Sequence, residues 1–193
     1  MRVDFFSGAM SPYSWFAIER VEAVLPEASW RPVFAGGLFR AAGRTSWGLD
    51  ERRAAGIADC EARAAAHGLE PIRWPEPWPT NDLLVARAMS VAAEAGVLRP
   101  FALGAMRLAF LEGADLGEPG AVAEAASRAR LDPEDVAQGA ARPEVKERLR
   151  TETDRAHALG VIGVPSVVVG NEVFWGDDRL EQAAASARSA AAG

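Results

Sequence analysis

The distribution of apolar and polar residues divides the chain into two ends that predict strands and a long helical middle. At the start, Arg2–Phe6 contains a short apolar run, which predicts a buried strand. Ile18, Val21 and Leu25 then recur at helical spacing, with charged residues between them, and Pro26 ends the run. The first unit of the fold is therefore predicted to be a strand followed by an amphipathic helix.

The middle of the chain, from about residue 45 to about residue 150, has helical periodicity and no credible strand. Before it, Trp30–Phe34 predicts a second strand and Gly36-Gly37 a turn. Asp132-Pro133-Glu134-Asp135 marks one helix start, with a capping Asp, Pro at the first position and acids in the first turn. Separate helices are predicted for Glu51–His67, Asn81–Ala95, Pro100–Leu111, Ala121–Ala129, Pro133–Gln138 and Glu144–Leu159.

After the helices, apolar residues return in an order that predicts a hairpin. Pro165 stands immediately before the β-branched run that ends at Val169. The two-residue turn Gly170-Asn171 follows, and a second strand runs on to Trp175. A proline at the entrance of a strand suits a cis peptide bond, so we expect the Val164-Pro165 bond to be cis. Gly176-Asp177-Asp178 then offers the start of a last helix.

The N-terminus of the first predicted helix carries the tetrapeptide Ser11-Pro12-Tyr13-Ser14. Ser11 is a good N-cap, because its oxygen can accept the N–H of Tyr13 or Ser14, and Pro12 suits the first helical position. The tetrapeptide has the form of a Cys-Pro-Tyr-Cys redox motif in which oxygen replaces both sulfurs. A helix N-terminus stabilises an anion such as a thiolate. The motif therefore favours a site that binds a thiol supplied by another molecule, although Ser-Pro taken alone only starts a helix.

The composition restricts the kinds of site and the classes of function that this chain can have. The 193 residues suit one domain, or one domain with an insertion, and the single cysteine, Cys60, excludes an intramolecular disulfide. We interpret Cys60 as a buried small hydrophobe, and we expect surface positions and no metal for His67 and His157, which lack ligand spacing. The net charge of −6 argues against nucleic acid, and no apolar stretch suits a membrane span. The first twenty residues carry no export signal, so we expect a cytoplasmic protein.

The segment from Trp74 to Asn81 contains three prolines and two tryptophans. Trp78 could wall an aromatic-substrate pocket over Ser11, with Asn81 orienting a carboxylate or carbonyl. Alternatively, the segment is a packed loop in which Asn81 caps the next helix. The remaining candidates for the pocket are better explained, one by one, as core residues: Trp15, Trp47 and Trp175.

Taken in order, these segments resemble the 2-hydroxychromene-2-carboxylate isomerases and the kappa-class glutathione transferases, which share a DsbA-type thioredoxin fold. The resemblance runs from residue 3 to about residue 185. The residues that carry it are Ser11-Pro12-Tyr13-Ser14, Trp30-Arg31-Pro32-Val33, Phe39-Arg40-Ala41, Pro79-Thr80-Asn81, Ala86-Arg87-Ala88, Gly163-Val164-Pro165 and Phe174–Leu180. It implies an α/β thioredoxin-like fold with an all-helical insertion. Residues 1–44 and 151–193 would form the thioredoxin-like domain and residues 45–150 the insertion.

The resemblance also implies a site for glutathione or another low-molecular-weight thiol. Ser11 would donate a hydrogen bond to the sulfur, and the cis-proline loop would offer its backbone. Two positions depart from the family: Ser7-Gly8-Ala9-Met10 lacks an Asp, and Gly43-Arg44-Thr45-Ser46 replaces a Gly-Asn-Xaa-Pro loop. Arg44 could still bind a carboxylate, but the identity of the thiol stays open. The implied thiol-binding residues are Ser11, Pro12, Tyr13, Arg44, Val164, Pro165, Asp177 and Asp178.

Three functions are compatible with these features of the sequence. The first is a thiol-dependent isomerase that acts on a small unsaturated aromatic carbonyl or carboxylate compound. The second is a kappa-type transferase or peroxidase, which would use the same site but consume the thiol. The third is a thioredoxin-fold binding module without turnover. The resemblance is also compatible with a homodimer.

Overall fold

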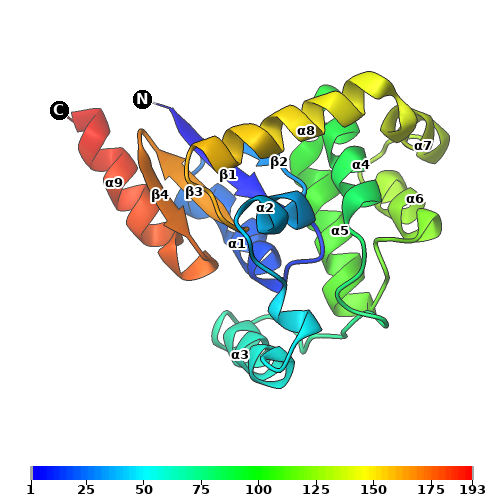
Figure 1. Ribbon diagram of the computed structural model, residues 1–193, viewed down its shortest axis with the longest axis horizontal. Helices are drawn as coiled ribbons and strands as arrows, with labels where there is room; N and C mark the ends of the chain where they lie inside the picture. The colour runs from blue at the N-terminus through cyan, green and yellow to red at the C-terminus, as the bar shows by residue number, and fades with distance from the viewer. Residues whose placement is uncertain (1, 193) are drawn as a thin grey trace.

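A four-stranded sheet forms the centre of the computed structural model, which describes residues 2–192. The strands stand in the order β2-β1-β3-β4, with β1 parallel to β2 and antiparallel to β3, and β3 antiparallel to β4. Figure 1 shows the sheet at one side of the molecule, with α9 along its outer flank and α4 to α7 at the opposite side. The strands are β1 (Val3–Ser7), β2 (Ser29–Pro32), β3 (Ser166–Val169) and β4 (Glu172–Trp175).

The helices follow the predicted order. Each helix predicted between residues 51 and 159 is present, and within the described residues no strand interrupts them. None of the described helices is long and apolar enough to cross a membrane. The helices are α1 (Pro12–Val24), α2 (Ala35–Ala41), α3 (Arg53–Ala66), α4 (Leu83–Glu94), α5 (Leu98–Glu112), α6 (Pro119–Arg128), α7 (Pro133–Ala141), α8 (Pro143–Ala158) and α9 (Leu180–Ala192), with 3₁₀ turns η1 (Trp47–Leu49) and η2 (Asp177–Arg179).

The helices between β2 and β3 make the architecture a thioredoxin-like sheet with an all-helical insertion, as predicted. The predicted boundary at residue 150 falls inside α8, which runs without a break from Pro143 to Ala158. The last turns of α8 pack on α2 and β2, whereas its start lies beside α7 (Figure 1). The division into residues 1–44 with 151–193 and residues 45–150 therefore stays a prediction, because the chain marks no break there.

The expected turn at Gly36-Gly37 is wrong, since both glycines lie inside α2. The Phe34 ring packs against them: a Cβ added at Gly36 or Gly37 would lie 2.8 or 2.9 Å from that ring. Side chains distant in sequence also hold the start of this helix. The Thr153 hydroxyl accepts the Phe34 N–H, and a carboxylate oxygen of Asp82 accepts the Ala35 N–H. Tertiary contacts thus stabilise a helix where two adjacent glycines predict a turn.

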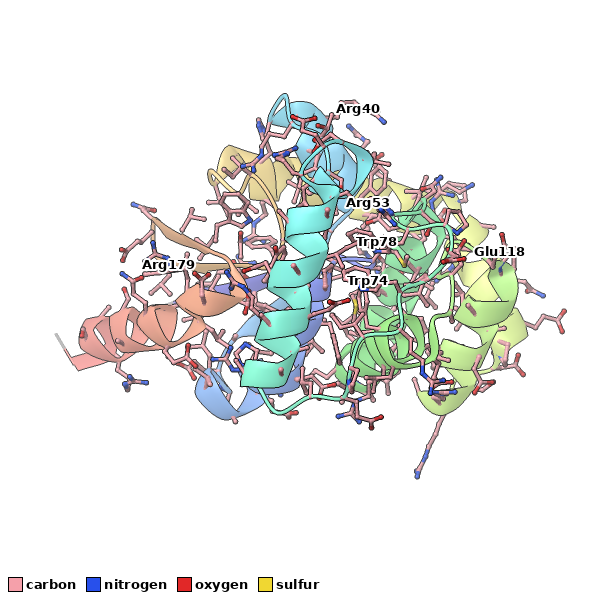
Figure 2. All side chains as sticks on the ribbon, turned by 90° about the horizontal axis from the view of Figure 1, so that it is seen from below. Arg40, Arg53, Trp74, Trp78, Glu118 and Arg179 are labelled. Carbon is pink, nitrogen blue, oxygen red and sulfur yellow. The ribbon has the colours of Figure 1, made fainter. Side chains whose placement is uncertain are left out.

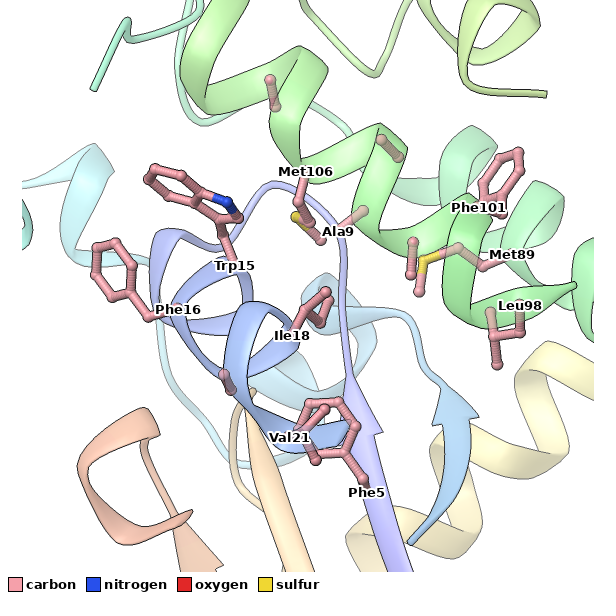
Figure 3. Packing of buried hydrophobic residues seen from close by; sticks show 14 of the residues in the cluster. Phe5, Ala9, Trp15, Phe16, Ile18, Val21, Met89, Leu98, Phe101 and Met106 are labelled. Carbon is pink, nitrogen blue, oxygen red and sulfur yellow. The ribbon is translucent and has the colours of Figure 1, made fainter. Parts of the chain in front are cut away.

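Both faces of the sheet are buried, because successive side chains of a strand point to opposite sides. Phe5 faces α1, and Figure 3 shows it close to Val21, below Ile18 and Trp15 of the same helix. Phe6 points the other way, into a second cluster formed with α2 and α8. This two-sided burial explains why β1 is apolar at most of its positions, as the sequence indicated.

Asp4 is the one acid on β1 and is almost fully buried. Its carboxylate forms ion pairs with Arg155 at 2.5 Å, Arg31 at 3.0 Å and Arg2 at 2.8 Å. Burial raises the pKa of Asp4, but the hydrogen bonds from Arg155, Arg31 and Arg2 outweigh burial and hold the pKa below its ordinary value. The ion cluster thereby joins the sheet to α8.

Candidate active site

A cavity of about 780 Å³ opens at the start of α1, between the sheet end of the molecule and the helical insertion. Its walls come from the start of α1, from α2, from the loop carrying η1, and from the segments that precede α4 and η2. The predicted site residues that line it are Ser11, Pro12, Tyr13, Arg44, Trp78, Asn81, Val164, Asp177 and Asp178. Pro165 does not line the cavity, but its carbonyl accepts the N–H of Gly176, a lining residue, at 3.0 Å. The fold therefore gathers residues from four distant parts of the chain.

Ser11 caps α1 as its sequence context predicts. Its Oγ accepts the Ser14 N–H at 3.2 Å, and its hydroxyl faces the Val164 carbonyl oxygen at 3.5 Å. The Val164-Pro165 bond is cis, and Ser11 lies across from it, so both expectations are confirmed. The half-buried Ser11 hydroxyl thus stands at the positive end of a helix and at the edge of the cavity.

Tyr13 lines the cavity with its ring while its hydroxyl is already bonded. The hydroxyl donates to the Asp59 carboxylate at 3.0 Å, and the Arg63 guanidinium lies over the ring at 5.3 Å. Burial raises the pKa of Tyr13, and the neighbouring Cys60 and Asp59 raise it further, so the phenol stays neutral. Tyr13 therefore presents an aromatic surface to the cavity, and its hydroxyl hydrogen is engaged by Asp59.

Cys60 lies under this part of the wall and is fully buried, as expected from the sequence. Burial raises the pKa of the Cys60 thiol to about 12. At neutral pH it is therefore protonated and inert as a nucleophile.

The two acids at the start of η2 have different environments. Asp177 is buried, and its carboxylate pairs with Arg63 at 3.0 Å and with the His67 ring nitrogen at 3.4 Å. Asp178 is exposed at the cavity. The expectation of a surface position is only partly right for His67, which is half-buried against Asp177, whereas His157 is exposed as expected. Asp178 is thus the acid of this pair that is free to meet a ligand.

Arg44 lies over the Trp175 ring, with its guanidinium carbon 4.4 Å from the ring centroid. Trp175 is 42% exposed, so the expectation of a core position is wrong for this tryptophan. Its indole crosses the cis-proline loop, where a Cβ at Gly163 would approach the indole nitrogen to 2.8 Å. Glycine at position 163 is therefore required for Trp175 to lie where it does.

The opposite wall is a cluster of aromatic rings. The centroid of the Trp78 ring lies 4.8 Å from that of Trp47 and 4.7 Å from that of Trp74. Trp78 is largely buried and donates its indole N–H to the Met10 carbonyl at 3.0 Å. Figure 2 shows Arg53, Trp78 and Trp74 one after another alongside α3, and Arg53 donates to the Trp78 carbonyl. Trp47 is half-buried and lines the cavity, so the expected core position is only partly right for it, whereas Trp15 is fully buried as expected.

Asn81 is exposed at the cavity, and its side-chain oxygen accepts the Leu83 N–H at 3.0 Å. This hydrogen bond at the start of α4 agrees with the capping role, which is one of the two roles predicted for Asn81. The same residue lines the cavity, so the role in the pocket stays a prediction.

Asp82, the next residue, is a site residue that the sequence pattern did not reveal. It lines the cavity at 6% exposure, and its Oδ2 accepts the Ala35 N–H at 3.3 Å. Burial raises the pKa of Asp82 to about 7, although the backbone N–H groups that it accepts oppose the rise. An acid just before a helix is common, and nothing local signals that this one is buried.

The charges at the cavity mouth favour an anionic ligand. Arg52 pairs with Asp50, and Arg63 pairs with Asp177. Arg40 and Arg44 also line the cavity, and neither forms an ion pair with any residue in the range 2–192. Within the same range, no three His, Cys, Asp or Glu side chains are grouped so that they could hold a metal ion.

Comparison with protein families gives one match that spans almost the whole chain. Residues 2–187 match the model of the DSBA-like thioredoxin domain. A search of curated protein sequences finds no significant relative.

Solved structures share the fold at low sequence identity. A 2-hydroxychromene-2-carboxylate isomerase superposes with a TM-score of 0.83 at 18% identity, covering 99% of this chain and 96% of that one. A probable DsbA oxidoreductase from Streptomyces coelicolor gives 0.71 at 24%, covering 98% and 90%. The cytosolic disulfide reductase DsbM from Pseudomonas aeruginosa, solved with GSH, gives 0.63 at 11%, covering 100% and 98%. At these identities the likeness shows the fold alone.

Proposed function

The chain belongs to the family of DSBA-like thioredoxin domains, and from this premise we propose that it is a thiol-dependent isomerase of an unsaturated aromatic carbonyl or carboxylate compound. The observation that carries the proposal is the position of Ser11. A hydroxyl, with no cysteine beside it, stands at the N-terminus of α1 and faces the carbonyl of the residue before the cis-proline. A dithiol–disulfide oxidoreductase needs a cysteine at this position, and the only cysteine of this chain is the buried Cys60.

The residues around Ser11 fit a small peptide-like thiol such as glutathione, which carries carboxylates and an ammonium group. Arg44 has no ion-pair partner among the described residues and lines the cavity, so it is suited to a carboxylate. Asp178 is exposed at the same cavity and is suited to an ammonium. The Val164 carbonyl oxygen faces Ser11 in the same cavity, and the DsbM relative that was solved with GSH supports the same class of thiol.

When bound, such a thiol supplies a sulfur nucleophile that adds reversibly to a conjugated double bond, so that the bond can rotate before it re-forms. Ser11 serves this step by donating its hydroxyl hydrogen to the sulfur in place of its 3.5 Å contact with the Val164 carbonyl. That hydrogen bond and the helix N-terminus stabilise the charged sulfur and lower the pKa of the thiol. The Ser14 N–H keeps the Ser11 oxygen oriented toward the cavity.

The aromatic wall and the cationic mouth define the class of substrate. The rings of Trp47 and Trp78, tilted by 50° to each other, provide an apolar wall, and Arg40 provides a cation without an ion-pair partner among the described residues. An aromatic compound with a carboxylate matches both features. The fold neighbour that isomerises 2-hydroxychromene-2-carboxylate supports this class. A reduced thiol pool is a property of the cytoplasm, so the proposal implies a cytoplasmic location.

The test is the glutathione-dependent interconversion of 2-hydroxychromene-2-carboxylate and its isomer, followed by absorbance. Thiol titration before and after the reaction distinguishes the classes, because an isomerase returns the thiol and a transferase consumes it. The Ser11→Ala variant should lower the turnover by about 10²–10³-fold, which is typical for the loss of one preorganised donor. Losing the N-cap costs only about 1 kcal/mol, so the variant should fold.

The matched control is Ser14→Ala, one turn along α1, whose hydroxyl is buried without a partner among the described residues. It should keep near-parental turnover. Ser11→Cys should lower the isomerisation, because a protein thiol at this position would crowd the bound sulfur or form a mixed disulfide with it. Full activity in Ser11→Ala would contradict the role of Ser11, and consumption of the thiol would favour the transferase.

A further inference from the structure

Asp82 is a buried acid in the wall of the cavity, and the proposed function gives it no role. It directly precedes α4 and is 6% exposed, and it reaches across the cavity wall to the start of α2. There its Oδ2 accepts the Ala35 N–H at 3.3 Å. The backbone N–H groups of Gly36 and of Asp82 itself also stabilise the carboxylate, and no side chain of residues 2–192 donates a hydrogen bond to it.

A continuous wall links Asp82 to the thiol site. Ala35, which Asp82 holds, packs beside Gly8 and Val164: a Cβ at Gly8 would lie 3.1 Å from the Ala35 Cβ and 3.1 Å from the Val164 Cγ2. Val164 in turn faces the Ser11 hydroxyl at 3.5 Å. A substrate that reaches the sulfur position beside Ser11 therefore lies on the same wall as Asp82.

No charged side chain among residues 2–192 neutralises Asp82. The charged groups that face the cavity are Arg40 from α2, Arg44 and Arg52 from the loop before α3, Arg63 from α3, and Asp177 and Asp178 from η2, while Arg87 lies on α4 itself. None of them forms an ion pair with Asp82 in the described structure. Burial therefore raises the pKa of Asp82 to about 7, against the opposing effect of the backbone N–H groups of Ala35, Gly36 and Asp82 itself, and the carboxyl group is largely neutral below pH 7.

We propose that Asp82 is the proton donor and acceptor of the isomerisation, an assignment that rests on the proposed function. Addition of the thiol sulfur to the β-carbon of an unsaturated carbonyl compound moves the electron pair of the double bond toward the carbonyl oxygen. The Asp82 carboxyl group transfers its proton to that oxygen and becomes a carboxylate. When the double bond re-forms, the electron pair returns, the carboxylate takes the proton back, and the starting protonation state is restored.

The position suits this exchange. A proton donor works best when its pKa lies near the working pH, and a buried carboxyl group meets that condition without a metal or a histidine. The Ala35 N–H stabilises the carboxylate while it exists and fixes the orientation of the side chain. Asp82 thus complements Ser11: one residue stabilises charge on the sulfur, and the other relieves charge on the substrate oxygen.

The test compares Asp82→Asn with the parent enzyme under saturating glutathione across pH. Asn keeps an acceptor for the Ala35 N–H but has no acidic proton. The turnover should fall by about 10²–10⁴-fold while the KM for glutathione stays near the parental value. In the parent, the turnover should decline above about pH 7 as Asp82 ionises, and this decline should be absent in the variant.

The matched control is Asp115→Asn. Asp115 holds the same loop from outside the cavity, by accepting the Thr80 hydroxyl at 2.6 Å and the Gly117 N–H at 2.7 Å. A purely structural disturbance of this loop should lower the turnover by the same factor at every pH. If Asp82→Asn does not fold, Asp82→Ser removes the acid with less bulk, and the parent's own pH profile tests the assignment without any variant.

A second readout does not depend on activity. In a carbon-13 NMR titration, the carboxyl signal that disappears in Asp82→Asn should titrate near pH 7 in the parent. Titration of that signal below about pH 5, or a variant that keeps both the turnover and the alkaline decline of an active parent, overturns the assignment of Asp82. Absence of thiol-dependent turnover in the parent instead refutes the proposed function, and with it the reaction that Asp82 would serve.

Discussion

Replacement of Asp82 by Asn should leave the stability of the protein almost unchanged at pH 4 and raise it at pH 8. The carboxyl group is 6% exposed, and burial raises its pKa to about 7. In the unfolded chain an aspartate has a pKa of about 3.9. Between these two values the folded protein binds a proton that the unfolded chain has released, so the free energy of unfolding falls as the pH rises.

The magnitude follows from the difference between the two pKa values. A shift of about 3 pKa units corresponds to about 4 kcal/mol, lost progressively from about pH 4 to about pH 7. Asn has no such proton and still accepts the Ala35 N–H, so the variant should escape this loss. For a protein of this size, about 1 kcal/mol shifts the melting temperature by about 2–4 °C. The variant should therefore melt roughly 10 °C above the parent at pH 8.

The assay is a set of thermal melts of parent and variant at several pH values. The quantity compared is the difference between their melting temperatures at each pH. This difference cancels the titration of every group that they share. Asp115→Asn is the control, since its carboxylate lies outside the cavity and should not produce the same trend. A difference that does not change with pH would refute the buried protonated state of Asp82 and remove the physical basis for its role as a proton donor.

Further outcomes follow from other parts of the structure. Insulin reduction should stay at background in both the parent and Cys60→Ser, and activity lost in the variant would contradict the inert thiol. Arg44→Ala should raise the KM for glutathione by about 10–100-fold with little change in turnover, and an unchanged KM would exclude Arg44 from thiol binding. Asp4→Asn should cost about 3 kcal/mol at pH 7, because it leaves Arg155 and Arg31 uncompensated. The pKa of Asp4 is lowered, so that difference should shrink as the pH falls below about 4, and denaturant titrations at both pH values measure it.

The sequence by itself predicted the features that depend on neighbouring residues. Ser11 caps α1 through the N–H of Ser14, three positions away. The turn at Gly170-Asn171 joins β3 to β4, with Gly170 at a φ of 61°. Asp132 caps α7 through the Glu134 N–H at 2.7 Å. These contacts lie within one turn of chain, so the local preferences of the residues are enough to predict them.

Only the tertiary structure decided which polar and aromatic side chains are buried. Asp82 is enclosed because α2, 47 positions earlier, lies against it, and Asp177 is enclosed because α3 brings Arg63 to it. Trp175 stays exposed because its ring lies over the glycine of the cis-proline loop and beneath Arg44. Burial depends on which distant surfaces the fold brings together, and it determines the charge that a carboxyl group carries. The pattern of residues could therefore predict which segments carry the candidate site, whereas the burial of Asp82 could be found only after the chain was folded.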